Sequence, residues 1–118
     1  GDDLFVTQVD RVSKGLDCAN TVLIKPNQVG TVSETFMCIE YAKEHDMRTM
    51  ISHRSGDTCD TSIVDIGLAA GVERIKSGAP CRGERVVKYN RILQLAKDNH
   101  LDYNLTDCQC LKDSVDKE

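Results

Sequence analysis

Short apolar runs alternate with longer segments of helical spacing along most of this 118-residue chain. Three of the runs have the length and composition of buried strands: residues 21–24, 48–51 and 74–75. Four segments place apolar residues at helical spacing and are predicted helices: residues 9–16, 31–44, 60–71 and 84–97. Thr31 and Glu34 have the spacing of a capping box where the second of these helices begins. Strands that alternate with helices in this way indicate βα units and a parallel sheet.

The polar residues next to the predicted strand ends recur at regular intervals. Asp2 precedes Lys25 by 23 residues; Lys25 precedes His53 by 28, and His53 precedes Lys76 by 23. A (β/α)8 barrel of about 250 residues has roughly 30 residues per unit, so these intervals suit successive barrel strands. Asp2 and Asp3 lie where a preceding strand would end. We therefore predict an α/β fold, a segment of a TIM-like (β/α)8 barrel with about three complete βα units, the end of a preceding strand, parallel strands and outer helices.

A barrel segment of this size has a physical problem when it stands alone. It leaves two open strand edges and an uncovered inner face, whereas parallel sheets are normally covered on both faces. Such a segment should be unstable, or pair with a partner, or fold its helices over the open face. The sequence does not choose among these three outcomes.

The charge balance excludes some classes of partner. The chain has 19 acidic and 15 basic residues, with a net charge of −4, which argues against a nucleic-acid partner. No apolar run approaches the roughly 20 residues of a membrane span, and no signal-peptide pattern opens the chain. Because the chain begins at Gly1 rather than Met, we expect it to be processed or to be a piece of a longer protein.

The six cysteines are scattered, and without a secretory signal we expect reduced thiols and a cytoplasmic location. Cys108 and Cys110 are the only close pair, and with no further ligand at suitable spacing they are weak evidence for zinc. Residues 98–118 contain few large apolar side chains, so we predict a loose tail there.

Residues 52–57, Ser-His-Arg-Ser-Gly-Asp, follow the second predicted strand and suit an anionic substrate. Arginine binds carboxylate or phosphate oxygens with two parallel hydrogen bonds, and the N–H groups that open a helix favour negative charge. Each residue also has a plainer interpretation: a lysine at a strand end is usually solvated, a lone histidine is usually structural, and Asp2 with Asp3 could be a fraying terminus. The basic series Arg82, Arg85, Lys88 and Arg91 is expected to be a solvated helix face, with anion binding as the less favoured alternative.

Five motifs in order are similar to the C-terminal part of enolase, from Gly1 to about Ala96. They are GDDLFVT at 1–7, LIKPNQVGT at 23–31, SHRSG at 52–56, IKSGAPCR at 75–82, and ER with KYN at 84–85 and 88–90. The resemblance implies a domain division at residue 97, with the C-terminal portion of an enolase barrel before it and a divergent tail after it.

The resemblance implies a lyase of glycolysis that interconverts 2-phosphoglycerate and phosphoenolpyruvate with Mg²⁺. By residue-wise transfer, Lys25 is the base that takes the C2 proton and Asp2 is a magnesium ligand. His53, Arg54 and Ser55 hold the substrate and its phosphate, and Lys76 holds its carboxylate. Removal of a proton beside a carboxylate creates a doubly charged species, which is why cations are needed there.

The family pattern also includes parts that precede Gly1: two further acidic magnesium ligands, a glutamate acid and the amino-terminal domain that makes most of the homodimer contact. Within the chain, Asp57 and Cys59 stand where glutamates are common, and the helix before Thr21 is about two residues short of the usual pattern. These observations leave three hypotheses: a partial sequence of an active enolase, a truncated inactive half-barrel that serves as an interaction module or is a degenerate product, and a split enzyme.

Overall fold

Three parallel strands form the sheet, in the order β1 (Thr21–Ile24), β2 (Arg48–Ser52) and β3 (Arg74–Lys76). In this computed structural model, which describes residues 1–100, Ile24 is paired with Ile51 and Ile51 with Ile75. The predicted strands are confirmed, each of the last two extending one residue further. The Cys108 and Cys110 pair and most of the predicted tail lie outside the described residues.

Six helices accompany the sheet within residues 1–100: α1 (Asp2–Phe5), α2 (Val9–Lys14), α3 (Pro26–Val29), α4 (Val32–Glu44), α5 (Ser62–Ala69) and α6 (Gly83–Asp98). The four predicted helices are present, two of them shorter than expected. The short α3 was not expected. Pro26 occupies its first turn, where the fixed φ of proline suits a helix start, and Gly30 ends it with φ 90°. Asp2 and Asp3 begin α1, and no strand precedes them among the described residues.

The core lies on one face of the sheet. Val22, Ile24 and Ile51 point to this face and pack with Phe5 and Val12 from the first two helices. The buried residues of α4 complete it at the i, i+3, i+4, i+7 spacing: Thr35, Cys38, Ile39 and Ala42. Val32, at the first position of α4, lies outside this buried stripe and is 55% exposed.

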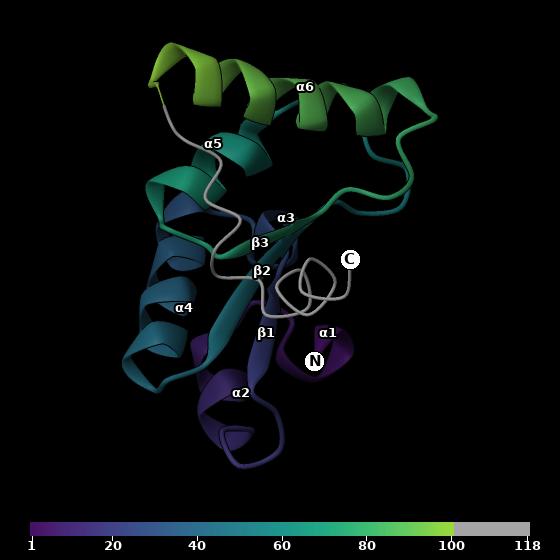
Figure 1. Cartoon of the computed structure of the whole chain (residues 1–118). Coiled ribbons are helices and arrows are strands. Elements are labelled where there is room, and N and C mark those ends of the chain that lie inside the picture. Colours follow the sequence, from purple (N-terminus) through teal and green to yellow (C-terminus); the bar gives the residue numbers. More distant parts are fainter. Residues whose placement is uncertain (101–118) are drawn as a thin grey trace, which may run out of the picture.

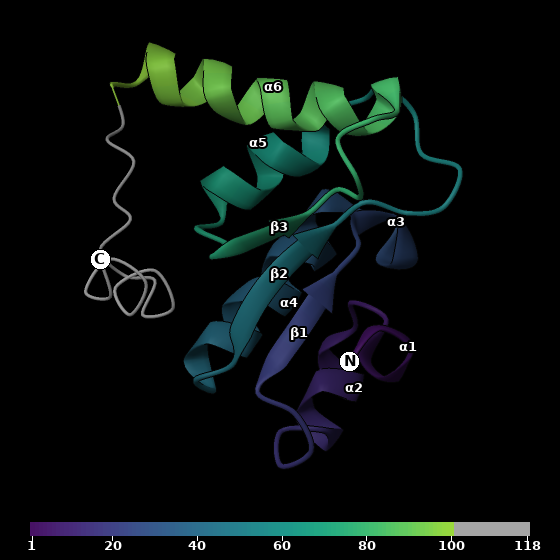
Figure 2. The same cartoon turned by 45° about the vertical axis from the view of Figure 1, so that its right-hand side comes forward.

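The opposite face of the sheet is less well covered. Leu23, Met50 and Arg74 are neighbours across the three strands on this face, the first two half-buried and the third exposed. In both views α4 runs along the sheet, α5 and α6 lie beyond β3, and α1 and α2 lie beside β1 (Figures 1 and 2). The result is a three-stranded segment of an α/β barrel, as predicted. No helix within residues 1–100 is long and apolar enough to cross a membrane.

Candidate active site

Polar side chains gather at the carboxyl edge of the sheet. Ser52 is paired with Lys76, and Lys25 directly follows Ile24, whose partner Ile51 directly precedes Ser52. The pairing therefore places two lysines in one row across the strands, with Ser52 between them. In an α/β barrel this edge carries the chemistry.

Asp2 joins this row from the N-terminal helix. Its Oδ2 lies 2.5 Å from Lys25 Nζ, and Gln28 Nε2 donates to its Oδ1 at 3.0 Å. The hydrogen bond from Lys25 is the main cause that lowers the pKa of Asp2; burial opposes it, and Gln28 and the charges of Lys25 and Lys76 lower it further. Asp2 is therefore an ionised carboxylate facing two cations.

His53 is fixed by the strand next to its own. Its backbone N–H donates to the Lys76 carbonyl oxygen at 3.0 Å, and its Nδ1 lies 3.1 Å from the same oxygen. Because a carbonyl oxygen only accepts, Nδ1 carries a proton, which in the neutral ring leaves Nε2 as an acceptor. The Ser52 hydroxyl donates to the His53 carbonyl at 2.8 Å.

Arg54 and Ser55 lie beside this group but do not contact it. Both are exposed in the loop after β2, which turns at Gly56 with φ 69°. Within residues 1–100 neither side chain makes a hydrogen bond, so both are free to meet a ligand. The structure thus brings Asp2, Lys25, His53 and Lys76 to one edge and leaves the other two expected residues on a neighbouring loop.

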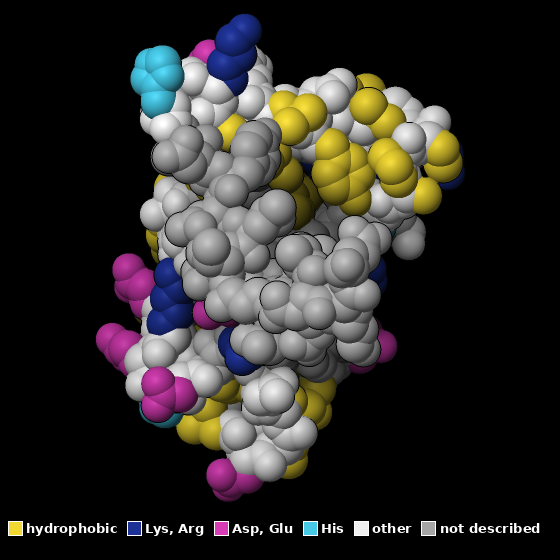
Figure 3. Space-filling model, in the orientation of Figure 1, with side chains coloured by type: hydrophobic (Ala, Val, Ile, Leu, Met, Phe, Trp, Pro, Cys, Tyr) yellow, Lys and Arg dark blue, Asp and Glu magenta, His cyan; other side chains and the backbone are white. Residues whose placement is uncertain are grey.

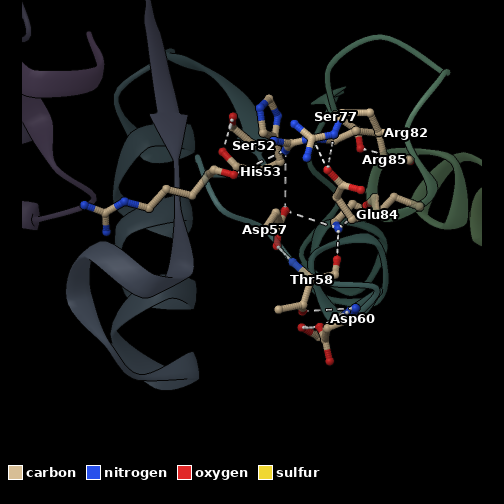
Figure 4. A network of polar contacts seen from close by, with 12 residues as sticks. Ser52, His53, Asp57, Thr58, Asp60, Ser77, Arg82, Glu84 and Arg85 are labelled. Atoms are coloured by element: carbon tan, nitrogen blue, oxygen red, sulfur yellow. Dashed lines mark hydrogen bonds and ion pairs between the residues drawn. The ribbon is translucent and has the colours of Figure 1, made fainter.

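The loop after β2 is held by α6. The buried Lys88 donates to the carbonyl oxygens of Thr58 at 2.9 Å and Glu84 at 2.7 Å, and its Nζ lies 3.2 Å from Asp57 Oδ2 (Figure 4). Arg85 donates to the Arg54 carbonyl at 3.2 Å. The Arg54 carbonyl, the Asp57 carboxylate and the Thr58 carbonyl of the loop are thereby bound to one helix.

This arrangement corrects the expectation of a solvated basic face on α6. Lys88 is 1% exposed, and the Arg85 side chain is 12% exposed. Arg91 reaches α5, where its Nη2 lies 2.7 Å from Asp65 Oδ1, and only Arg82 of the series is widely exposed. Charge and spacing do not predict this, because the carbonyl and carboxylate partners outside α6 are 26 to 31 residues away in sequence.

The loop after β3 is held by the same helix. Tyr89 donates to the Gly78 carbonyl at 2.6 Å, and Ser77 donates to the Arg85 carbonyl at 3.3 Å. One helix therefore orients both loops that border the carboxyl edge.

Near the start of α6, Figure 3 shows hydrophobic side chains gathered on the surface, whereas acidic and basic groups gather over α4.

The comparison with known proteins gives a family. The family description "Enolase, C-terminal TIM barrel domain" matches residues 1–106. The chain belongs to the enolase family. It is 54% identical over 100 residues to enolase 2 of Pseudomonas syringae pv. syringae (strain B728a), covering 83% of this chain and 23% of that protein.

Other enolases give similar values. The enolase of Methanosarcina barkeri (strain Fusaro) is 51% identical over 100 residues, covering 83% of this chain and 23% of its own length. The enolase of Sulfurisphaera tokodaii is 46% identical over 105 residues, with coverages of 87% and 25%. The chain therefore spans about a quarter of the length of these curated relatives.

The metal expected of an enolase can be tested against the donor groups. Residues 1–100 contain no cluster of three His, Cys, Asp or Glu side chains that could hold an ion. Among residues 1–100, Asp2 is the carboxylate that contacts the row at the carboxyl edge, and Mg²⁺ sites combine one or two carboxylates with substrate oxygens and water. The described residues therefore fit a single contributed ligand and do not form a site for two ions.

Nucleophilic cysteine chemistry has no support in residues 1–100. Their four cysteines are free, and Cys38 is buried, which raises the pKa of its thiol to about 11. A thiol with so high a pKa is inert at neutral pH. The three exposed cysteines, 18, 59 and 81, make no hydrogen bond to a base within these residues.

Proposed function

We propose that these residues form the C-terminal part of the catalytic barrel of an enolase, a Mg²⁺-dependent lyase of cytoplasmic glycolysis. Such an enzyme interconverts 2-phosphoglycerate with phosphoenolpyruvate and water. In this proposal Lys25 is the base that removes the C2 proton. Lys76 binds the substrate carboxylate, and Asp2 contributes one magnesium ligand.

The observation that carries the proposal is the meeting of Asp2, Lys25 and Lys76 at one edge of the sheet, from segments 23 and 51 residues apart in sequence. Removing a proton beside a carboxylate adds negative charge to an already anionic substrate. The Lys76 ammonium at this edge offsets that charge, while Lys25 in its neutral form accepts the proton.

The phosphate of the substrate is assigned to the loop after β2. Arg54 and Ser55 are exposed and without side-chain partners in residues 1–100, and a guanidinium binds phosphate oxygens with two parallel hydrogen bonds. His53 offers Nε2 toward a donor on the substrate. In the described state Lys25 is a donor to Asp2, so it must leave that carboxylate before it can accept a proton.

A second candidate is a catalytically inactive half-barrel that serves as an interaction module or is a degenerate product. It is favoured by the single carboxylate that residues 1–100 place against the row of Lys25 and Lys76, and by the poorly covered sheet face. A split enzyme, in which another chain supplies the missing strands, lies between the two. In each case the expected partner is protein, by analogy with the family homodimer, rather than nucleic acid.

The absorbance of phosphoenolpyruvate separates these candidates. The purified chain is mixed with 2-phosphoglycerate and Mg²⁺, alone and with an enolase 2 of Pseudomonas syringae truncated before the matching segment. We expect no turnover alone and measurable turnover with the complementing fragment. Lys25→Ala should abolish that turnover, whereas Lys14→Ala, an exposed lysine on α2, should leave it unchanged.

Two results would contradict the proposal. Turnover that survives Lys25→Ala would remove Lys25 from the role of base. A chain that binds the fragment but gives no turnover would favour the inactive module.

A further inference from the structure

The side chains of Thr7 and Gln28 connect Lys25 with Asp2. We propose that they are positioning residues, which fix the proposed base Lys25 and the proposed metal ligand Asp2 relative to each other. The roles of Lys25 and Asp2 rest on the proposed function, whereas the linkage itself rests on the contacts described below.

Four hydrogen bonds close a ring through these four residues. The Lys25 backbone N–H donates to Thr7 Oγ1 at 2.9 Å, and the Thr7 hydroxyl donates to Gln28 Oε1 at 2.8 Å. Gln28 Nε2 donates to Asp2 Oδ1 at 3.0 Å, and Lys25 Nζ donates to Asp2 Oδ2 at 2.5 Å. The ring thus touches both the backbone and the ammonium group of Lys25.

The direction of each hydrogen bond follows from the chemistry of the groups. The Asp2 carboxylate only accepts, so the amide nitrogen of Gln28 faces it and the amide oxygen faces Thr7. The Thr7 proton must then point at Gln28, which leaves its lone pairs for the Lys25 N–H. No group in the ring can be reversed without losing a hydrogen bond.

The ring joins segments that local interactions would not hold together. Asp2 is in α1, a helix of only four residues, and Thr7 follows that helix in the turn to α2. So short a helix has little stability of its own. Lys25 and Gln28 belong to the strand end and to α3. The side chains of Thr7 and Gln28 therefore add a second link between α1 and the end of β1, beside the direct contact of Asp2 with Lys25 and the packing of Phe5.

The backbone at Thr7 gives a second, independent observation. Val6 and Thr7 have φ values of 41° and 55°, in the left-handed region that β-branched residues rarely adopt. Glycine would suit this turn better, but it has no hydroxyl group. Thr7 is also completely buried, so its side chain is held in one place. Strain of this kind persists where the surrounding contacts demand a particular side chain.

Hydrogen exchange of the Lys25 amide tests the ring without reference to activity. Thr7→Val keeps the shape of the side chain and removes the acceptor, so the Lys25 N–H should exchange about tenfold faster. Thr7→Ser should keep the protection of the original chain. Thr35→Val, which removes another buried threonine hydroxyl within α4, should not speed the Lys25 amide beyond the increase that its own loss of global stability gives every slowly exchanging amide.

Kinetics with the complementing fragment test the positioning role. Thr7→Val and Gln28→Met should lower kcat about tenfold with KM within roughly twofold, because a displaced base affects the chemical step more than substrate binding. Thr7→Ser should restore kcat. A merely structural role would lower the amount of folded protein and leave kcat unchanged once it is corrected for the folded fraction.

The outcomes separate the two claims. If turnover is abolished by Lys25→Ala but unaffected by Thr7→Val and Gln28→Met, the positioning role is wrong and the proposed function stands. If the complex shows no turnover, the proposed function fails, and the exchange rates still decide whether the ring exists. A Lys25 amide that exchanges equally fast in the original chain and in Thr7→Val overturns the inference.

Discussion

Thr49 is a buried residue whose hydroxyl group is not hydrogen-bonded in the described part of the chain. Its Oγ1 is fully buried in β2 and has no hydrogen-bond partner among residues 1–100. Thr49→Val removes the uncompensated hydroxyl while nearly conserving the shape, so we expect the free energy of unfolding to rise by about 1 kcal/mol. Denaturant titration measures the change.

Thr35→Val is the matched control for this prediction. The Thr35 hydroxyl donates to the Thr31 carbonyl at 2.8 Å, so its removal should lower the free energy of unfolding by about 0.5–1.5 kcal/mol. The same chemical change is therefore expected to raise the free energy of unfolding at Thr49 and to lower it at Thr35. If Thr49→Val were as destabilising as Thr35→Val, the Thr49 hydroxyl would have a partner after all.

Lys88 is the buried charge on which the loop after β2 depends. Lys88→Met leaves Asp57 and the Thr58 carbonyl without their ammonium partner, although Asp57 keeps Arg85 at 3.8 Å. Breaking a fully buried pair costs about 3–5 kcal/mol, and because the Asp57 side chain is 21% exposed we expect a loss of roughly 2–3 kcal/mol.

Arg82→Met is the control on the same helix. Arg82 pairs with Glu84 at 2.9 Å, but its side chain is 75% exposed, so its loss should cost about 0–0.5 kcal/mol. Proteolysis gives a second measurement, since cleavage in residues 53–58 should accelerate in Lys88→Met alone. Equal effects of the two substitutions would mean that Lys88 does not hold the loop.

At the level of elements, the sequence predicts what local patterns determine. The three strands and α4 follow from β-branched runs and from the Thr31 cap, whose side chain accepts the Glu34 N–H at 3.2 Å. The regular spacing of Lys25, His53 and Lys76 similarly predicts their common edge. Each of these signals lies within one segment or repeats between adjacent segments.

What the sequence leaves open depends on contacts between distant segments. Arg85 and Lys88 of α6 contact the loop after β2 because carbonyl groups of that loop accept their hydrogen bonds. The basic composition of the helix does not predict these contacts. The connection from Thr7 to Gln28 is missed for the same reason, because 21 residues separate them. The resemblance locates the residues to which we assign direct roles, whereas the residues proposed to support them become visible only in the fold.

The start of α5 is stabilised by a carboxylate, which makes its stability depend on pH. Asp60 Oδ1 accepts hydrogen bonds from the hydroxyl and the backbone N–H of Ser62, and these two bonds, in that order, lower the pKa of Asp60 against a small opposing effect of burial. The folded chain therefore binds the proton less readily than the unfolded chain. This contribution is fully present above the unfolded pKa of about 3.9 and is lost as the pH falls through the folded value.

Asp60→Asn tests this dependence. We expect the original chain to be more stable than the variant at pH 6, with a difference that stays constant down to about the unfolded pKa of 3.9 and shrinks below it toward pH 3. Denaturant midpoints measured across this range give the comparison, with Asp17→Asn, an exposed acid without a hydrogen bond in residues 1–100, as the control. A difference that is constant with pH would show that the ionised form of Asp60 does not stabilise the helix start.

At the scale of the molecule, the sheet of the described residues has one face that is only partly covered. The described residues bury one face of the sheet against α4 and the first two helices, and leave the other face half-buried or exposed. A partner that covers this face and pairs with a free strand edge binds the folded chain and not the unfolded one. By mass action, a fragment present at a hundredfold excess over its Kd adds about 2.7 kcal/mol.

We therefore expect the truncated Pseudomonas syringae enolase 2 to raise the Tm of this chain by roughly 10–20 °C at such an excess, since a domain of this size shifts by about 4–8 °C for each kcal/mol. Differential scanning calorimetry at several fragment concentrations measures the rise, and serum albumin is the control for nonspecific effects. The shift must grow with the logarithm of the fragment concentration if it comes from binding to the native fold.

Leu23→Glu and Met50→Glu place charges on the uncovered face, where the isolated chain tolerates them but a completed barrel interior does not. These variants should abolish the shift and change the Tm of the chain alone by much less. A Tm that fails to respond to the fragment would mean that the open face is not where a barrel is completed.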